Sequence, residues 1–443
     1  MRILDTTILN EQYEIIRHKD ILIADGRIQK ILDTKSSTDC FRVREKTEEV
    51  IDGRHLLFLP GLIDSHMHTG QQLLRGRVLD ELPMIWTRIM LPFESRLTKE
   101  KMRLSAELAS LEMMKSGTSG FVEAGSYFME EAAAVYADSG LRGVLSCSTM
   151  DQPGLPETIA DTAQSAVERT DRLYEFVQEQ MKENQEKTLK VYYSLRSLMS
   201  CSSELVCLVK EHASERNAWI QAHMNEYAGE VNAIVTREHL RPYEYLAKLG
   251  VLSDHFLGAH SLLVSEKEMD LLKEYEVKVC HCPFSNCGKA APNTPGLFAR
   301  GISIGLGTDG TAHGGMSLWN EMKIFRSVMN LLHGVPMAEP AIMPAKKILQ
   351  MVLEGGAAAL GEENSCGCLK EGYRADLIGI NLDQPHIFPS GNLLNTLVES
   401  VNANDVTHMI VNGKLVMKNR EVLTLDEERI LYEAKEYLEK EEW

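Results

Sequence analysis

The sequence predicts an α/β protein in which a (β/α)8 TIM barrel is joined to a small β-sandwich domain built from both chain ends. Two observations predict this architecture. Eight apolar runs alternate with long amphipathic stretches over residues 60–364, and strands that alternate with helices usually pair in parallel. Shorter alternating runs, separated by turn residues, occupy residues 1–59 and 365–425.

The two chain ends carry the pattern of antiparallel strands. In ILIADGRIQKIL the dipeptide Asp25-Gly26 separates two apolar runs, and in VTHMIVNGKLVMKN the dipeptide Asn412-Gly413 does the same. Such dipeptides favour the tight turn of a β-hairpin. We expect both ends to pair into one β domain, followed by a surface helix over residues 426–443.

The middle of the chain contains the runs that predict the barrel. They are LPGLIDSHMH, SGFVEAG, LRGVLSCSTM, LKVYYSLRS, AWIQAHMNE, HFLGAHS, VKVCHCP and ISIGLGTDG. Eight such units within about 300 residues suit a (β/α)8 barrel. Polar and ionisable residues gather at the C-terminal ends of the runs, which is where such barrels carry their chemistry.

The composition of the 443-residue chain excludes several classes of protein. A hydrophobic share of 44% and a charged share of 25% are ordinary for globular domains and argue against disorder. The net charge of −17 repels phosphate backbones, so we expect no nucleic-acid partner. No apolar run reaches about 18 residues, so we expect no membrane span.

The cysteines and the N-terminus predict the compartment. There are nine cysteines, an odd number, and the start MRILDTTILNEQYEII turns polar too soon for a signal peptide. Free thiols in a reducing cytoplasm fit this pattern. Cys280 and Cys282 are too closely spaced for the usual zinc ribbon, so their spacing does not favour a metal role.

Five residues at the ends of predicted strands are good metal ligands. His66 and His68 are two positions apart, so both imidazoles point to the same face of a strand. His-x-His pairs also occur on ordinary strands, but His223, His260 and Asp309 end three further runs. Neutral imidazole and carboxylate groups suit zinc or ferrous iron in a catalytic site.

Glu226 follows His223 by three residues in HMNE. A carboxylate just past a strand end could take a proton from a metal-activated water and deliver it to a leaving group. The alternative is a solvated loop carboxylate. The neighbouring ligands favour the catalytic interpretation.

These residues together resemble the amidohydrolase superfamily, and within it the chlorohydrolase and aminohydrolase group. The matching segments span nearly the whole chain: PGLIDSHMHTGQQLLRG, SGTSGFVEAG, HMNE, LGAHS, VKVCHCPFSN, IGLGTDG, KEGYRADLIGI and MIVNGKLV. The combination is highly specific, although each segment alone is not.

The resemblance implies a hydrolytic reaction at one divalent metal ion, with zinc favoured over iron. It implies a metal site made of His66, His68, His223 and Asp309. It further implies that His260 polarises the attacking water, that Glu226 shuttles protons, and that Asp309 also accepts a proton from that water. No organic cofactor is expected, because no glycine-rich nucleotide loop of the Rossmann or P-loop type is visible.

Within this group the chain is similar to the methylthioadenosine/S-adenosylhomocysteine deaminases. The similar pieces are LLRG, Leu82-Pro83, Trp86 and PFESRLTKEKM. The resemblance implies that Glu94 contacts ribose hydroxyls and places Trp86 among the substrate-binding residues. A carboxylate that accepts from two hydroxyls is chemically sensible, and the alternative for Glu94 is an ordinary helix-start carboxylate.

Two positions depart from those deaminases. Arg196 stands where they usually carry a substrate-contacting histidine, and Cys147 stands where an arginine would bind the homocysteine carboxylate. Because a buried carboxylate without a cationic partner is costly, we do not expect S-adenosylhomocysteine as the substrate. Arg196 and Gln71 instead resemble the guanine deaminases, in which an arginine and a glutamine read the oxopurine edge. A structural ion pair is the other interpretation of Arg196.

The sequence therefore leaves three enzymatic functions open. An adenosine-type nucleoside deaminase comes first, a guanine, oxopurine or pteridine deaminase second, and a triazine chloro- or aminohydrolase third. A non-catalytic binding barrel would need a missing ligand or the loss of Glu226, and neither is seen. The expected partner is a small heterocyclic molecule, and homo-oligomers are common in the family.

Overall fold

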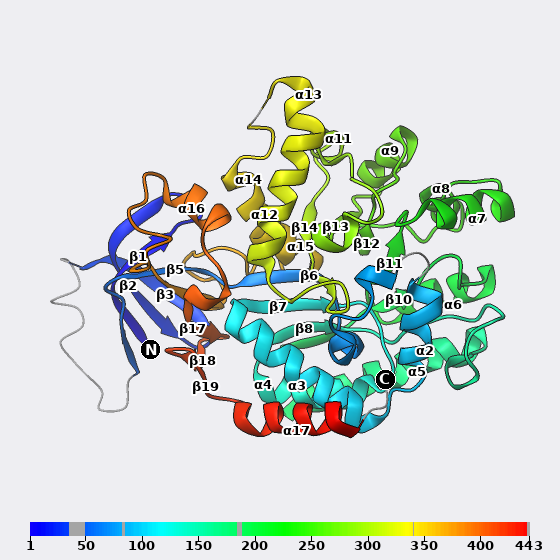
Figure 1. Ribbon diagram of the computed structural model, residues 1–443, viewed down its shortest axis with the longest axis horizontal. Coiled ribbons are helices and arrows are strands. Elements are labelled where there is room, and N and C mark those ends of the chain that lie inside the picture. Colours follow the sequence, from blue (N-terminus) through cyan, green and yellow to red (C-terminus); the bar gives the residue numbers. More distant parts are fainter. Residues whose placement is uncertain (35–48, 82–84, 184–187, 340, 441–443) are drawn as a thin grey trace.

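The computed structural model describes residues 1–34, 49–81, 85–183, 188–339 and 341–440. It confirms a mixed α/β protein (Figure 1). A sheet that contains both chain ends lies beside a larger part in which parallel strands alternate with helices. Cys40 and the Leu82-Pro83 pair lie outside the described residues.

The first part is a nine-stranded sheet that joins the two ends of the chain. Its strand order is β19-β18-β17-β16-β5-β1-β2-β3, and β4 pairs with β1. The strands are β1 (Arg2–Leu9), β2 (Ile15–Ala24), β3 (Arg27–Asp33), β4 (Val50–Asp52), β5 (Leu56–Pro60), β16 (Leu377–Asn381), β17 (Val406–Val411), β18 (Lys414–Lys418) and β19 (Glu421–Val422). The two ends meet where β16 pairs antiparallel with β5.

Both hairpin turns that the sequence singled out have the backbone that those dipeptides favour. Asp25 and Gly26 have φ angles of 52° and 71°, and Asn412 and Gly413 have 48° and 76°. A type I′ turn needs a positive φ at both central residues, which Asx-Gly pairs supply at little cost. The two turns also touch, because a side chain at Gly26 would meet the Asn412 side chain at 2.9 Å.

The second part contains two five-stranded parallel sheets, ordered β15-β6-β7-β8-β9 and β10-β11-β12-β13-β14. Their strands are β6 (Leu62–His68), β7 (Thr118–Glu123), β8 (Arg142–Leu145), β9 (Leu189–Val191), β10 (Tyr193–Leu195), β11 (Ile220–Met224), β12 (Phe256–His260), β13 (Lys278–His281), β14 (Ile304–Leu306) and β15 (Asp309–Gly310). Two of the eight expected strands are thus each divided in two.

The hydrogen bonds continue through the division at Tyr192, the residue between β9 and β10. Its amide donates to Leu145 O (3.0 Å), whereas the next amide, of Tyr193, donates to Trp219 O (2.9 Å). Successive residues therefore bond to opposite neighbours, and the chain passes from one sheet to the other without a loop. The second transition, from β14 to β15, spans two residues, Gly307 and Thr308.

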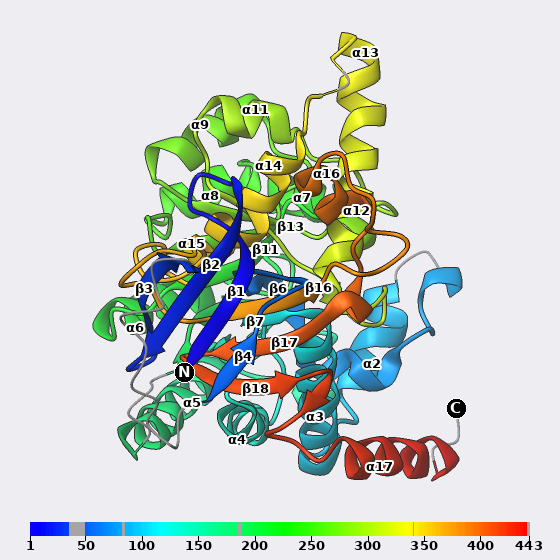
Figure 2. The ribbon, with the colours of Figure 1, turned by 90° about the vertical axis from the view of Figure 1, so that its left-hand side faces the viewer.

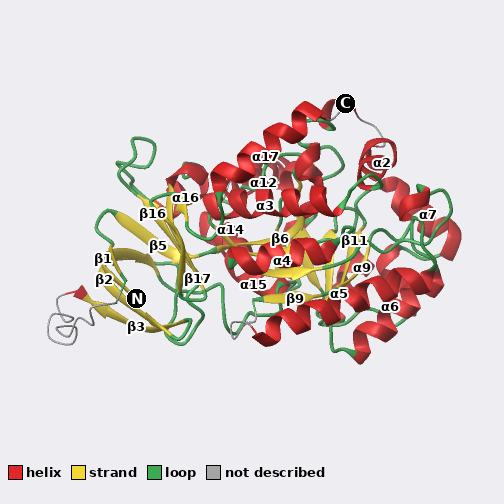
Figure 3. Cartoon of the chain, turned by 90° about the horizontal axis from the view of Figure 1, so that it is seen from below, coloured by secondary structure: helices red, strands yellow, loops and turns green. Residues whose placement is uncertain are grey.

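Helices cover the parallel strands (Figure 3). They are α2 (Leu91–Glu94), α3 (Lys99–Ser116), α4 (Met129–Ser139), α5 (Ala163–Glu183), α6 (Ser203–Glu215), α7 (Ala228–Glu238), α8 (Pro242–Lys248), α9 (Glu266–Glu274), α10 (Pro283–Asn286), α11 (Thr294–Ala299), α12 (Leu318–Met329), α13 (Val335–Met337), α14 (Ala345–Gln350), α15 (Gly356–Ala359), α16 (Leu393–Glu399) and α17 (Glu427–Lys440). Capping residues in the local sequence determine where several helices begin. In α9, for example, Ser265 and Glu268 form a capping box.

The C-terminal helix α17 lies along α3 (Figure 1). Arg429 Nη2 donates to Glu107 Oε1 at 2.8 Å, which ties this helix to a buried carboxylate of α3. Among the residues described, no helix combines the length and the apolar character needed to cross a membrane. The eight cysteines within the described ranges are all free thiols.

Candidate metal and substrate site

The candidate ligands come from the C-terminal ends of neighbouring strands. His66 and His68 lie two apart on β6, and His223 and His260 lie at the ends of β11 and β12. β11 and β12 pair in parallel with Met224 opposite His260, whereas β6 belongs to the other parallel sheet, where it pairs with β15. Asp309 pairs with Met67, directly between the two β6 histidines.

Four of these side chains form a tight buried group. Ligand nitrogens of His66, His68 and His223 all lie within 4.8 Å of one another. His68 Nε2 is 3.2 Å from His223 Nε2 and 3.3 Å from Asp309 Oδ1. His66 Nε2 lies 3.9 Å from the same carboxylate oxygen. The side chains at the four sequence positions therefore converge, as a shared ligand set requires.

Burial sets the charge of this group. It holds the pKa of His66 and His223 well below the usual histidine value, and it lowers the pKa of His68 as well. The imidazoles are therefore neutral at neutral pH, which is the form that binds metal. Neither ring nitrogen of His66 has a hydrogen-bond partner among the described residues. Neutral nitrogens without partners beside a carboxylate fit a zinc or ferrous ion.

Asp309 supplies the negative charge. Burial alone would raise its pKa, but Lys289 and the neighbouring histidines hold the pKa well below the usual carboxyl value. Ser285 Oγ donates to Asp309 Oδ2 at 2.6 Å, and the Gly310 amide donates to Oδ1 at 2.8 Å. The carboxylate is therefore both ionised and held in one orientation.

A second group joins Asp309 to the predicted acid–base residues. Oxygens of Glu226 and Asp309 and a nitrogen of His260 lie within 4.8 Å of one another, and His260 Nε2 is 3.6 Å from Glu226 Oε1. Asn286 Oδ1 accepts from the Cys282 amide at 2.9 Å, so its Nδ2 is the atom 3.0 Å from His260 Nδ1. An amide nitrogen only donates. His260 Nδ1 is therefore an acceptor, and Nε2 carries the proton that faces Glu226.

Comparison with known proteins identifies the family. The model of the Amidohydrolase family matches residues 57–416. This chain belongs to the Amidohydrolase family. It is 33% identical over 445 residues to a protein named 5-methylthioadenosine/S-adenosylhomocysteine deaminase from Dictyoglomus turgidum, with 98% of this chain and 97% of the relative covered. It is 31% identical to a 5'-deoxyadenosine deaminase from Methanosphaera stadtmanae, with 97% and 96% covered.

A solved structure shows the same fold for this amidohydrolase. The crystal structure of an adenosine deaminase from Xanthomonas campestris with bound zinc superposes with a TM-score of 0.89. The two share 23% sequence identity, and the match covers 99% of this chain and 98% of the other.

The proposed substrate residues of this amidohydrolase form a charged corner next to the histidines. Arg196 Nη2 donates to Glu94 Oε1 at 2.9 Å, and Gln71 Nε2 donates to the same oxygen at 3.0 Å. The two charged side chains are 3% and 2% exposed, so the ion pair is buried. Arg196 Nη1 also reaches Gly125 O at 3.0 Å and His68 Nδ1 at 2.9 Å. The structural ion pair weighed as the alternative for Arg196 is thus present.

Trp86 lies on the apolar side of the helix that carries Glu94. It packs against an apolar cluster of Leu91, Tyr127, Met150 and Ile159. Arg169 lies over the Tyr127 ring at 5.1 Å and reaches Ser148 O, but its guanidinium is already paired with Asp161. Cys147 is buried.

Two further residues, Lys289 and His313, lie in the site but outside the set predicted from the sequence. Lys289, which no motif marked, contacts Glu226 Oε1 and lies 3.6 Å from Asp309 Oδ2. His313, which lies in a loop, is buried with Nδ1 at 3.8 Å from Asp309 Oδ2. Its position four residues after Asp309 was the only available signal for His313.

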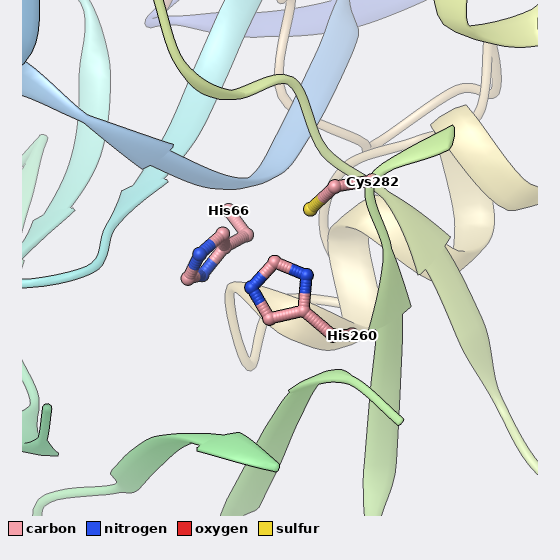
Figure 4. A group of neighbouring side chains, drawn as sticks. All are labelled: His66, His260 and Cys282. Atoms are coloured by element: carbon pink, nitrogen blue, oxygen red, sulfur yellow. The ribbon is translucent and has the colours of Figure 1, made fainter. Parts of the chain in front are cut away.

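Cys282 also enters the pocket, beside His66 and His260 (Figure 4). The three could be mistaken for a metal site, because their ligand atoms lie within 4.8 Å of one another. However, Asn286 fixes the proton of His260 on Nε2, so this nitrogen has no lone pair for a metal. Burial also raises the pKa of the Cys282 thiol well above its usual value. The His66, His68, His223 and Asp309 group fits a metal ion better.

Proposed function

We propose that this amidohydrolase is a metal-dependent aminohydrolase that releases ammonia from a purine-type heterocycle, with an adenosine-type nucleoside such as 5′-methylthioadenosine or 5′-deoxyadenosine as the preferred substrate. The observation that carries the proposal is the convergence of His66, His68, His223 and Asp309 with Glu226 and His260 in one buried pocket. Relatives at 31–33% identity over nearly the full chain are named as deaminases of such nucleosides.

We further propose that the two parallel sheets form one eight-stranded (β/α)8 barrel over residues 60–364. The direct passage between β9 and β10, and between β14 and β15, supports this. The nine-stranded sheet, from residues 1–59 and 365–425, would be the β-sandwich domain. The C-terminal helix proposed over residues 426–443 is described as α17 (Glu427–Lys440), and residues 441–443 lie outside the described residues.

The proposed ligands of one divalent ion, zinc ahead of iron, are His66, His68, His223 and Asp309. When bound, such an ion lowers the pKa of water so that it can attack near neutral pH. If His68 bound the ion through Nε2, its ring proton would lie on Nδ1, to which Arg196 donates in this structure. Loading therefore requires that the contact between Arg196 and His68 relax.

The chain's own residues would move the protons. His260 donates from Nε2 and orients the attacking water. Glu226 accepts a proton from that water as the new C–O bond forms at the ring carbon. It then delivers this proton to the ring nitrogen. The second proton of the attacking water, left on the new hydroxyl group, passes to the amino group. The C–N bond breaks, ammonia leaves, and the ring keeps the oxygen as a carbonyl.

The charged corner supports a nucleoside. Glu94 Oε2 and Gln71 Oε1 are buried acceptors with no partner among the described residues. A substrate that fills this corner must bring donors, because an unsatisfied buried acceptor costs about 1–3 kcal/mol. The two hydroxyls of a ribose meet this need. Ring N–H groups of an oxopurine or pteridine would meet it too, and the contact of Gln71 with the Arg196–Glu94 pair favours that class as the second candidate. A triazine chloro- or aminohydrolase comes third.

The test is ammonia release by the zinc-loaded protein. The panel contains adenosine, 5′-deoxyadenosine, 5′-methylthioadenosine, S-adenosylhomocysteine, guanine, isoxanthopterin and a chlorotriazine. We expect turnover of the first three. Preferred turnover of guanine or the pterin would assign the corner to a ring edge and overturn the nucleoside proposal. Stoichiometric metal without ammonia from any compound would overturn the deaminase proposal.

We place the protein in the cytoplasm because its described cysteines are free thiols. We also propose a homo-oligomer. Large apolar side chains are exposed at the projecting end of the α12–α13 helix (Figure 2), namely Leu331, Leu332, Val335 and Met337. Exposed apolar clusters mark contact surfaces. Light scattering should show a larger assembly for the wild type than for V335E, and a wild-type monomer would contradict this.

A further inference from the structure

Lys289 is a buried cation in the middle of the acid–base group. Its side chain is 5% exposed. It contacts Glu226 Oε1, donates to Ser285 Oγ at 2.7 Å, and lies 3.6 Å from Asp309 Oδ2. Its ammonium group also sits 5.2 Å from the centre of the Tyr227 ring. Lysine is almost never fully buried unless it is paired, and here the carboxylates of Glu226 and Asp309 supply the pairing charge.

The contacts of Lys289 belong to a larger arrangement. The short segment that begins with α10 carries Ser285, Asn286 and Lys289. Ser285 donates to Asp309 (2.6 Å), Asn286 donates to His260 (3.0 Å), and Lys289 contacts Glu226. One segment therefore holds all three proposed acid–base groups, each by a different residue. The backbone bond from the Lys289 amide to Asn286 O (2.8 Å) keeps the segment compact.

The partners of Lys289 leave it no free donor for a substrate. An ammonium group has three N–H donors. One is directed at Glu226, one at Ser285, and the third side of the group faces the Tyr227 ring. Lys289 therefore acts on the reaction through the carboxylates. Its charge also offsets the repulsion between Glu226 and Asp309, which lie within 4.8 Å of each other.

We propose that Lys289 is a positioning residue for Glu226. It holds Oε1 on the side of His260 and Asp309, so that Oε2 is the oxygen that faces the ring nitrogen of a bound heterocycle. This inference rests on the proposed function, in which Glu226 moves the proton. It assigns a role to a residue that lies outside the ligand set and outside the substrate corner.

The test measures kcat and KM separately in the K289M variant and in the wild type. We expect kcat to fall about 10–100-fold, the range seen when a group that orients a site residue is removed, with KM changed less than about threefold and zinc content unchanged. K278M is the matched control. Lys278 also lies over an aromatic ring, at 5.7 Å from Trp219, and donates to Glu276 O away from the site. It should leave kcat unchanged.

A double variant shows whether Lys289 acts through Glu226. In the E226Q background, K289M should lower kcat less than twofold further, because there is no longer a carboxylate to position. If K289M does not fold, K289Q is measured in its place. An unchanged kcat in K289M, a rise in KM that accounts for the whole loss, or full additivity with E226Q would each overturn the proposal. If the wild type turns over no panel compound, the proposed function fails and this inference fails with it.

Discussion

The histidine end of the site (His66, His68, His223 and His260) and its corner end (Glu94, Arg196 and Gln71) differ in charge. The histidine end holds neutral imidazoles, because burial lowers the pKa of His66, His223 and His260 well below the usual value. The corner end holds a full ion pair, between Arg196 and Glu94, in equal burial. The two ends touch where Arg196 Nη1 lies 2.9 Å from His68 Nδ1.

The difference shows what each end still needs. At the histidine end, neither ring nitrogen of His66 has a hydrogen-bond partner within the described part of the chain, so this end fits a cation. At the corner the charges are already balanced, and the atoms without partners are the acceptors Glu94 Oε2 and Gln71 Oε1. The corner therefore needs hydrogen-bond donors rather than charge. A metal ion and a hydroxylated or N–H-bearing substrate complement the two ends separately.

The largest expected effect comes from the proton path at the histidine end. E226Q should lower kcat about 10²–10⁴-fold, the usual contribution of a general acid–base group, while zinc content stays at the wild-type level. Ammonia release and elemental analysis measure the two quantities. E230Q is the matched control. The pKa of buried Glu230 is raised to about 8, so Gln replaces a carboxyl that is already neutral at pH 7. Equal losses in both variants would contradict the assignment.

Substitution of the Arg196–Glu94 ion pair should lower the free energy of unfolding. R196M leaves the buried Glu94 carboxylate without its cation, and breaking a buried pair in this way costs about 3–5 kcal/mol of unfolding free energy. Removing both charges in E94Q/R196M should recover most of that loss. Urea denaturation of the metal-free proteins measures both. R169M breaks a more exposed pair with Asp161 and should cost less. An R196M protein as stable as the wild type would show that Glu94 does not depend on Arg196 for its stability in the folded protein.

The contact between the two ends predicts a smaller effect, on metal affinity. E94Q/R196M removes one positive and one negative charge, so the net charge of the pocket is unchanged, but His68 Nδ1 is freed from the guanidinium. We expect zinc to bind about tenfold more tightly. The size is that usual for groups that contact a ligand histidine, but the sign is opposite, because the guanidinium donates to the ring nitrogen that would carry the proton in the metal-binding form. Competition with a chromophoric chelator measures the affinity. Unchanged binding would mean that Arg196 does not oppose metal loading.

The histidine end is the part that the sequence predicts well. Side chains on a strand alternate with period 2, so the spacing of His66 and His68 already places both rings on one face. Parallel strands bring their ends together, so His223, His260 and Asp309 follow from their positions at the ends of runs. Whether these side chains perform the assigned roles stays a prediction.

The corner could not be predicted in the same way. Glu94 and Arg196 are 102 residues apart in the sequence, and their pairing depends on side-chain conformations that no local pattern encodes. In sequence they pointed to different substrates, whereas in the structure they form one group with Gln71. Lys289 was missed for a similar reason. It lies just after a four-residue helix, and only the turn that follows this helix directs it back to Glu226.

A pH-dependent effect concerns Glu123, which supports both ends. Its carboxyl accepts from the Gly125 amide (2.7 Å) and the Thr69 amide (3.2 Å), next to the carbonyl that binds Arg196 and next to His68. Burial raises its pKa to about 8 despite these bonds. Between its unfolded pKa near 4.3 and about 8, the folded protein keeps a proton that the unfolded chain has lost. Stability therefore falls as pH rises through this window, by at most about 1.4 kcal/mol per pH unit.

E123Q cannot titrate and should remove this slope. Gln has one acceptor oxygen, so the variant loses one amide contact, but that loss is the same at every pH. Relative to the wild type, E123Q should thus become more stable as pH rises from 5 to 8, as measured by urea unfolding at several pH values. Comparing the two proteins cancels the titration of all other groups. Parallel stability curves would mean that Glu123 is ionised in the folded protein. The positive charge of Arg196 would then stabilise two carboxylates, Glu94 and Glu123.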